Sequence, residues 1–231
     1  MPRVARIVIP DVPHHVIQRG NNRQDVFFVD DDRRAYLRLL REHAERFRLD
    51  VIGYSLMTNH VHLVVVPHAA DSLAKTIGRT DFVYTQHINR LHGRSGHLWQ
   101  NRFTSCALDE KHTVAAVRYV EQNPVRAGLA KHAWDYPWSS AGAHVLGKDP
   151  TGLLDMTTWL REWDPKDWRK VLSSETDTVS VSALRLSTAR GRPLGSDSFL
   201  SKMESVLGQR VRSHPVGRPP GWRKHKGGRA K

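Results

Sequence analysis

The chain of 231 residues contains a single cysteine, Cys106. One thiol excludes an internal disulfide framework and a zinc finger built on cysteines, and it fits a reducing cytoplasm. Long apolar runs are also missing: the longest is about four residues, whereas a membrane-spanning helix needs about 20. No signal peptide is visible. The sequence therefore predicts a cytoplasmic protein that does not enter a membrane.

Acidic residues are scarce relative to basic ones, with 23 Asp and Glu against 36 Lys and Arg and a formal net charge of +13. Such an excess of positive charge attracts polyanions, of which nucleic acid is the commonest inside a cell. An anionic membrane surface is the competing partner. Hydrophobic residues make up 39% of the chain, which is enough for a packed core.

The most informative motif that is present is His60-Val61-His62, followed by an apolar segment that ends at Val66. Side chains two residues apart in a β-strand point to the same face of a sheet, so the two imidazoles converge. This arrangement is typical of a metal site. The spacing alone leaves an alternative open, in which one histidine faces water and the other is a satisfied core residue.

Hydrophobic periodicity predicts alternating strands and helices. Strands are expected at 14–19, around 52–56, from 60 onward and near 103–108, and helices at 32–48, at 72–91 and from 110 to about 123. The last helix must end there because Pro124 disfavours helical geometry in the residue before it, and Thr58-Asn59 predicts a hairpin. The order predicts an α+β fold, a ferredoxin-like antiparallel sheet covered by helices, with a C-terminal helical, basic appendage.

Composition divides the chain into three parts. Residues 1–130 hold the predicted sheet, 131–183 a tryptophan-rich helical extension with a linker at 173–187, and 184–231 a basic, partly disordered region. This last part has twelve Lys and Arg against two acidic residues, and a short helix is expected from the cap Ser196 to Gly208. The tryptophans are expected to pack the extension rather than to stack on bases; they are Trp134, Trp138, Trp159, Trp163 and Trp168.

Tyr119 and Asn123 are four residues apart on the last predicted helix, so they lie on one face of it. If this face covers the sheet near His60 and His62, one site holds two imidazoles, an amide oxygen and a phenol. These groups suit phosphodiester chemistry, in which a cation polarises a phosphate oxygen and the tyrosine oxygen attacks phosphorus. The alternative is structural: Tyr119 packs the helix against the sheet, and Asn123 merely ends the helix.

Three separated segments resemble the REP-associated tyrosine transposases, which belong to the single-tyrosine branch of the HUH endonucleases. The segments are YSLMTNHVHLVV from Tyr54, GHLWQNRF from Gly96 and YVEQNPVRAGL from Tyr119. The resemblance spans roughly residues 1–145. It implies that His60 and His62 are metal ligands, that Tyr119 is the nucleophile, that Asn123 is the third ligand, and that Mg²⁺ or Mn²⁺ is the cofactor.

The chain departs from related insertion-sequence transposases at Asn123, where they usually have glutamine. Asparagine is one methylene shorter, so the helix must approach the metal more closely or a water must bridge. Manganese suits the imidazole ligands better than magnesium, which prefers oxygen.

The resemblance implies a metal-dependent enzyme that cleaves and rejoins single-stranded DNA at hairpins of REP-like palindromes, through a covalent phosphotyrosine. Such an enzyme is expected in the cytoplasm, associated with the nucleoid. Two other functions stay open: a catalytically inactive hairpin-binding protein, and a hydrolytic metalloenzyme in which water attacks the phosphate. The sequence does not decide between a monomer and a homodimer.

Two basic segments are expected to hold the DNA backbone. The first runs from Arg19 to Arg23, and the second from Arg90 to Arg102. In the second segment, Trp99 is either a stacking surface for bases or a core residue. The Gly-Arg-Pro triplets around Arg192 and Arg218 resemble minor-groove hooks, and nonspecific tethering is the alternative. The expected DNA-binding residues are Arg19, Asn21, Asn22, Arg23, Arg90, Arg94, His97, Trp99, Arg102, Arg192 and Arg218.

Overall fold

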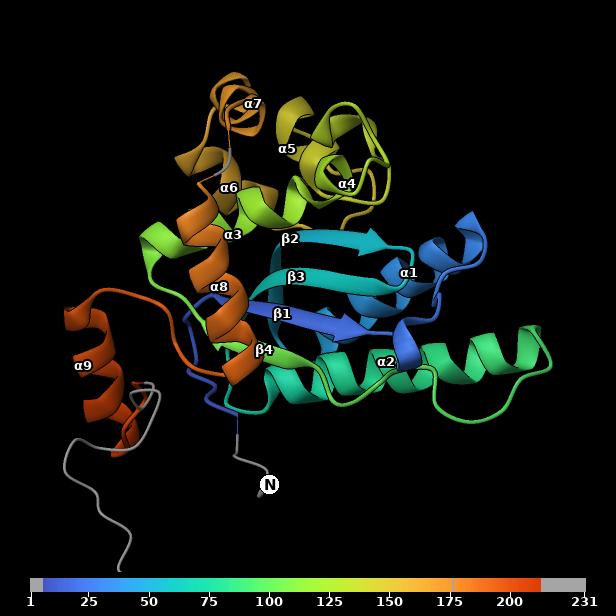
Figure 1. Ribbon diagram of the computed structural model, residues 1–231, viewed down its shortest axis with the longest axis horizontal. Coiled ribbons are helices and arrows are strands. Elements are labelled where there is room, and N and C mark those ends of the chain that lie inside the picture. The colour runs from blue at the N-terminus through green and yellow to red at the C-terminus, as the bar shows by residue number, and fades with distance from the viewer. Residues whose placement is uncertain (1–5, 176, 213–231) are drawn as a thin grey trace, which may run out of the picture.

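The computed structural model of the protein describes residues 6–175 and 177–212. The centre of the molecule is a four-stranded antiparallel sheet in the order β2-β3-β1-β4 (Figure 1). Its strands are β1 (His14–Arg19), β2 (Leu49–Met57), β3 (His60–Pro67) and β4 (Thr104–Ala107). Helices follow β1 and β3, and the resulting β-α-β-β-α-β order with these neighbours is the ferredoxin-like arrangement. The predicted fold class is confirmed.

The β2–β3 hairpin turns at Thr58 and Asn59, as the sequence predicts, and pairs Met57 with His60. His60 and His62 share one face of the sheet because successive side chains of a strand alternate. The alternate residues of β3 are buried in the core on the opposite face; they are Val61, Leu63 and Val65.

Two long helices, α1 (Asp30–Arg46) and α2 (Ser72–Leu91), cover this apolar face. Three aspartates open α1, where negative charge is favourable next to the positive end of the helix dipole. One of them, Asp32, also accepts the backbone N–H of Phe28 at 2.7 Å and of Val29 at 3.0 Å. The helices predicted at 32–48 and 72–91 are confirmed.

The histidine-bearing face is covered by α3 (Glu110–Glu121), which begins after its cap Asp109. The helix ends two residues before Asn123, and a short helix, α4 (Asn123–Arg126), follows. Pro124 lies in the first turn of α4, where its missing N–H costs no hydrogen bond. Gly53 of β2 permits the close approach of α3, because a Cβ at this position would lie 3.3 Å from Val117.

The tryptophan-rich extension is helical and packs on α3. Trp159 and Trp168 are buried in the same cluster as residues of α3, and Trp134 and Trp163 pack against this cluster. Trp138 packs against the core formed with α1 and α2. The expected packing role of the tryptophans is confirmed. The elements of the extension are η2 (Ala133–Asp135), α5 (Ala141–Leu146), α6 (Met156–Glu162) and α7 (Pro165–Ser173).

The expected linker at 173–187 is wrong over most of its length, because Thr178–Arg190 forms the helix α8. The side chain of Asp177 caps this helix by accepting the N–H groups of Val179 and Ser180. Leu184 and Thr188 are buried, and α8 lies over β1 and β4 in front of the sheet in Figure 1. The domain boundary predicted at 184 falls inside α8, so the C-terminal part of the chain takes part in covering the sheet.

The last helix, α9 (Asp197–Leu207), begins at the cap Ser196 and ends at Gly208, whose φ is +60°, as predicted. Phe199, Leu200 and Met203 pack in a small cluster with the N-terminal Ile7 and Ile9. Val206 of the same helix lies outside this cluster and is 64% exposed.

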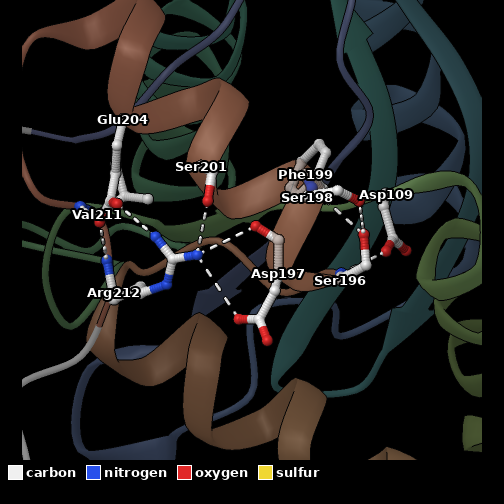
Figure 2. Close-up of polar contacts among 9 residues, drawn as sticks. All are labelled: Asp109, Ser196, Asp197, Ser198, Phe199, Ser201, Glu204, Val211 and Arg212. Atoms are coloured by element: carbon white, nitrogen blue, oxygen red, sulfur yellow. Dashed lines mark hydrogen bonds and ion pairs between the residues drawn. The ribbon is translucent and has the colours of Figure 1, made fainter.

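Polar contacts fix α9 at both ends (Figure 2). The backbone N–H of Ser196 donates to Asp109 Oδ2 at 2.8 Å, which connects the caps of α9 and α3. After the helix the chain turns back, and the Arg212 guanidinium donates to Ser201 Oγ at 2.9 Å and forms an ion pair with Glu204. Residues 213–231, which belong to the region expected to be partly disordered, lie outside the described residues. No helix of the described residues is long and apolar enough to cross a membrane.

Candidate active site

His60 and His62 lie on the same face of β3, with ring centroids 5.0 Å apart. Each ring is held through its Nδ1 atom: that of His60 donates to Asn59 Oδ1 at 2.6 Å, and that of His62 lies 3.1 Å from His15 Nε2. In the part of the chain that the structure describes, no hydrogen bond engages the Nε2 atom of either ring. Both Nε2 atoms are therefore available to a ligand.

Burial keeps these imidazoles neutral. Burial first, and the charge of Arg19 second, lower the pKa of His60 to about 4. Burial, together with the neighbouring imidazoles and arginines, lowers the pKa of His62 well below its ordinary value. A neutral imidazole has the lone pair that a metal ion requires.

Tyr119 lies over these strands on α3. Its ring meets the rings of His62 and His15 nearly at right angles, with centroid distances of 5.6 and 5.8 Å. Its hydroxyl accepts a hydrogen bond from Arg185 Nε of α8 at 3.2 Å, and the Arg126 guanidinium carbon is 4.3 Å from the ring centre. Two cations therefore contact Tyr119, Arg185 at its oxygen and Arg126 over its ring.

Asn123 is the first residue of α4 and is buried. Its Oδ1 atom accepts a hydrogen bond from Arg126 Nη2, which also donates to the Tyr119 carbonyl at 2.7 Å. Its Nδ2 atom is buried without a hydrogen-bond partner among the described residues. The amide oxygen predicted as the third metal ligand thus accepts a hydrogen bond from Arg126, whose positive charge opposes a metal ion at the same oxygen.

Within residues 6–175 and 177–212, no group of three or more His, Cys, Asp or Glu side chains is arranged to hold a metal ion. The candidate donors differ from such a group, because they are two imidazole nitrogens and one amide oxygen. This mixed set fits a divalent cation, and it suits Mn²⁺ better than Mg²⁺. Water and phosphate oxygens would complete the coordination.

Three residues that contact the predicted site are not predicted from the sequence: His15, Arg126 and Arg185. The contact of His15 with His62 depends on the register of β1 against β3, which the sequence does not specify. Arg185 lies in the segment interpreted as a linker. Arg126 had the clearest signal, because it lies within the third resemblance segment, one turn beyond Asn123.

The two basic segments predicted to contact DNA lie side by side, at the end of β1 with η1 (Asn21–Arg23) and in the loop after α2. The backbone N–H of Asn21 donates to the Leu98 carbonyl at 2.8 Å, and that of Gln100 donates to the Arg19 carbonyl at 2.9 Å. The two segments, which are far apart in the sequence, therefore form one surface. Its exposed side chains include Asn22, Arg23, Arg90, Arg94, His97 and Arg102.

Trp99 is a core residue, which is the second of the two roles left open for it, and it offers no stacking surface for bases. It is 9% exposed, its Nε1–H donates to the Asp81 carbonyl at 3.3 Å, and its ring packs against two buried tyrosines. Arg192 donates to the Arg210 carbonyl at 3.2 Å, so a part of its hydrogen-bonding capacity is used within the chain. Arg218 lies outside the described residues.

Two cavities flank residues 100–102. One of about 300 Å³ is lined by Arg19, Arg102 and Arg185, and it adjoins the nucleophile candidate because Arg185 also contacts the Tyr119 hydroxyl. The other, of about 590 Å³, shares Arg102 and includes Asp81. Burial raises the pKa of Asp81 to about 8, so at pH 7 this carboxyl is mostly neutral and subtracts little from the positive charge of the surface.

Known proteins resemble the chain over its N-terminal half. Residues 9–123 match the family described as IS200-like transposase. A protein of Haemophilus influenzae described as a REP-associated tyrosine transposase is 24% identical over 124 residues, which cover 49% of this chain and 68% of the relative.

One solved structure supports the fold. A REP-associated tyrosine transposase bound to a REP hairpin aligns with a TM-score of 0.52 and 18% identity, over 65% of this chain and 90% of the other. A protein of Deinococcus radiodurans described as a transposase aligns with a TM-score of 0.37 and 20% identity, over 52% and 97% of the two chains.

The fold and the family match define the class of this protein, a DNA transposase. The N-terminal half of the chain, residues 9–123, belongs to the IS200-like transposase family, and the chain is related to the REP-associated tyrosine transposases. The resemblance stated from the sequence is confirmed. The matched segment ends at Asn123, so α8 and its Arg185 lie beyond it.

Proposed function

We propose that this transposase is a metal-dependent endonuclease and strand transferase that acts on single-stranded DNA at REP-like hairpins, at the nucleoid in the cytoplasm. One observation carries the proposal: the ring of Tyr119 lies 5.6 Å from that of His62, on the face where the Nε2 atoms of His60 and His62 have no partner among the described residues. A nucleophile candidate and two metal-ligand candidates are therefore adjacent.

In the proposed reaction Tyr119 is the nucleophile. Its oxygen forms a bond to phosphorus while its proton passes to water, the bond from phosphorus to the leaving strand oxygen breaks, and this oxygen takes up a proton. Arg185 stabilises negative charge on the tyrosine oxygen through its hydrogen bond. Rejoining is the reverse reaction, because the phosphotyrosine conserves the bond energy of the cleaved phosphodiester.

His60 and His62 would hold a divalent cation, with Asn123 as a third donor once Arg126 releases its oxygen. When bound, Mn²⁺ or Mg²⁺ polarises a phosphate oxygen. Attack on phosphorus also requires a fixed position of the Tyr119 phenol, and the chain itself holds this phenol over β3.

A covalent DNA–protein adduct tests the proposal. The full chain is incubated with hairpin-bearing single-stranded oligonucleotides, labelled at either end, that represent palindromic repeats of the source genome. We expect cleavage in Mn²⁺ or Mg²⁺ but not in chelator, together with a labelled adduct that protease removes. A linear duplex of the same sequence is the control and should remain intact.

A hairpin-binding protein without catalysis is the second candidate. The observation that favours it is the closed site: Tyr119 is 4% exposed, and its hydroxyl is held by Arg185 of α8. Tight hairpin binding without an adduct across the repeat panel would favour this candidate. Metal-dependent cleavage without any adduct would instead indicate attack by water.

We also propose that the DNA backbone follows the basic surface beside the 300 Å³ cavity, where Arg19, Arg102 and Arg185 converge. Arg102→Gln should weaken hairpin binding several-fold and lower the slope of log K against log salt by about 0.7 to 0.9, the effect of one lost phosphate contact. Titrations at several salt concentrations measure both quantities. Arg161→Gln, an exposed arginine on α6, is the matched control; an equal effect in both variants would contradict a local contact.

A further inference from the structure

His62 is the end of a buried chain of hydrogen bonds that begins on α8. The Thr188 hydroxyl donates to the Leu184 carbonyl at 2.8 Å, one turn earlier in the helix. His15 Nδ1 lies 2.8 Å from the Thr188 oxygen, and His15 Nε2 lies 3.1 Å from His62 Nδ1. His15 and Thr188 are both fully buried, so water does not substitute for any member.

The number of protons in this chain determines the direction of each hydrogen bond. A hydroxyl has one proton, and that of Thr188 is donated to Leu184, so its oxygen accepts from His15 Nδ1–H. A buried imidazole without a carboxylate among its contacts is neutral, so His15 Nε2 has no proton and accepts from His62 Nδ1–H. His62 is then the Nδ1–H tautomer, and the lone pair lies on its Nε2.

A second contact agrees with this direction. Cys106 Sγ lies 3.1 Å from the Thr188 oxygen, and burial raises the pKa of this thiol to about 12. The thiol therefore keeps its proton and can donate it to the Thr188 oxygen. This oxygen is free to accept because its own proton is donated to the Leu184 carbonyl. The rings of His15 and His62 are nearly parallel, with an interplanar angle of 10° and a centroid distance of 5.3 Å, which agrees with an in-plane hydrogen bond that restrains the orientation of His62.

We infer that His15 is a positioning residue that holds His62 in the tautomer required of a metal ligand, and that Thr188 sets the tautomer of His15. The metal-ligand role of His62 rests on the proposed function, whereas the tautomer does not. It follows that α8, which lies beyond the segment matched by the family model, completes the site. Second-layer partners of this kind orient histidine ligands and raise their basicity.

The first experiment measures the tautomers directly, without metal or DNA. Long-range ¹H–¹⁵N correlation spectra of the full chain with labelled histidine distinguish a protonated from an unprotonated ring nitrogen. We expect both His15 and His62 to be Nδ1–H tautomers. Assignment of the Nε2–H tautomer to His62 would overturn the inference, and this outcome does not depend on whether the protein cleaves DNA.

Substitutions then test which residue sets the tautomer. Thr188→Val removes the accepting oxygen and should shift His15 and His62 toward the Nε2–H form, whereas Thr188→Ser should leave both spectra unchanged. Thr113→Val is the matched control, because the Thr113 hydroxyl makes the same bond to the carbonyl one turn earlier, at 2.8 Å, and has no hydrogen bond to a histidine among the described residues. Unchanged tautomers in a folded Thr188→Val protein would contradict the role of Thr188.

Metal affinity provides the second readout. His15→Phe should weaken Mn²⁺ binding, measured by electron paramagnetic resonance, by about 10- to 100-fold. His15→Gln retains an oxygen that can accept from His62 and should restore most of the affinity. His14→Gln, the buried neighbour on the other face of β1, controls for loss of packing. Equal losses of Mn²⁺ affinity in His15→Gln and His15→Phe would indicate a merely structural role. Absence of Mn²⁺ binding by the wild type would defeat the proposed function, and the spectra would still decide the tautomers.

Discussion

Tyr119→Phe should abolish the covalent adduct and lower cleavage by at least about 10³-fold, as expected for loss of a nucleophile. Hairpin affinity should change little, because phenylalanine keeps the ring that packs on His62 and His15 and lies under Arg126. The substitution removes only the oxygen and its hydrogen bond from Arg185. Adduct yield on denaturing gels and hairpin titration measure the two quantities.

Tyr136→Phe is the matched control. The Tyr136 hydroxyl donates a hydrogen bond to the Leu56 carbonyl at 2.8 Å, so both variants lose a buried hydroxyl oxygen together with its hydrogen bonding. The control should form the adduct at the wild-type rate if it remains folded. An adduct that persists in Tyr119→Phe would assign the nucleophile to another residue.

The fold was predictable because its elements have strong periodic signals. Alternation in β3 and the turn at Thr58-Asn59 predict that His60 and His62 share a face, whatever the register of the sheet. The spacing of Tyr119 predicts that it shares one helix face with Asn123, but α3 ends at Glu121 and Asn123 begins α4. Local periodicity therefore predicted which side chains share a face, and the resemblance to the transposase family gave them their candidate roles.

The remaining parts of the site depend on contacts that local periodicity does not encode. His15 meets His62 only in the observed pairing of β1 with β3. The helix α8 is rich in serine and threonine, which have modest helix propensity, and burial of Leu184 and Thr188 supports it instead. Arg185 could not be placed without that helix. Arg126 donates a hydrogen bond to the amide oxygen of Asn123 and so competes with a metal ion for this atom. The spacing of residues in the sequence does not predict this contact.

Glu121→Ala should destabilise the protein by about 3 to 5 kcal/mol, the usual loss when one partner of a buried charged network is removed. The carboxylate is fully buried between α3 and the helical extension. It accepts hydrogen bonds from Ser140 Oγ at 2.5 Å, His144 Nδ1 at 2.6 Å and Trp168 Nε1 at 2.8 Å. Alanine leaves these three donors buried without their acceptor.

Urea unfolding followed by circular dichroism measures this change. Glu110→Ala, an exposed glutamate in the first turn of the same helix, should alter the free energy of unfolding by less than about 0.5 kcal/mol. A loss below about 1 kcal/mol in Glu121→Ala would show that water or a rearranged side chain satisfies the donors.

The same carboxylate connects the extension with the site, because Glu121 lies between Tyr119 and Asn123 in the chain. Glu121→Gln keeps the shape and one acceptor oxygen but turns an N–H toward a former donor, so its loss of stability should be smaller. If the network holds the end of α3 over the sheet, this variant should form the adduct more slowly at temperatures where it is fully folded, with unchanged hairpin affinity. An unchanged adduct rate would limit the network to stability, and the position of Tyr119 would then depend on its own contacts with the sheet and α8.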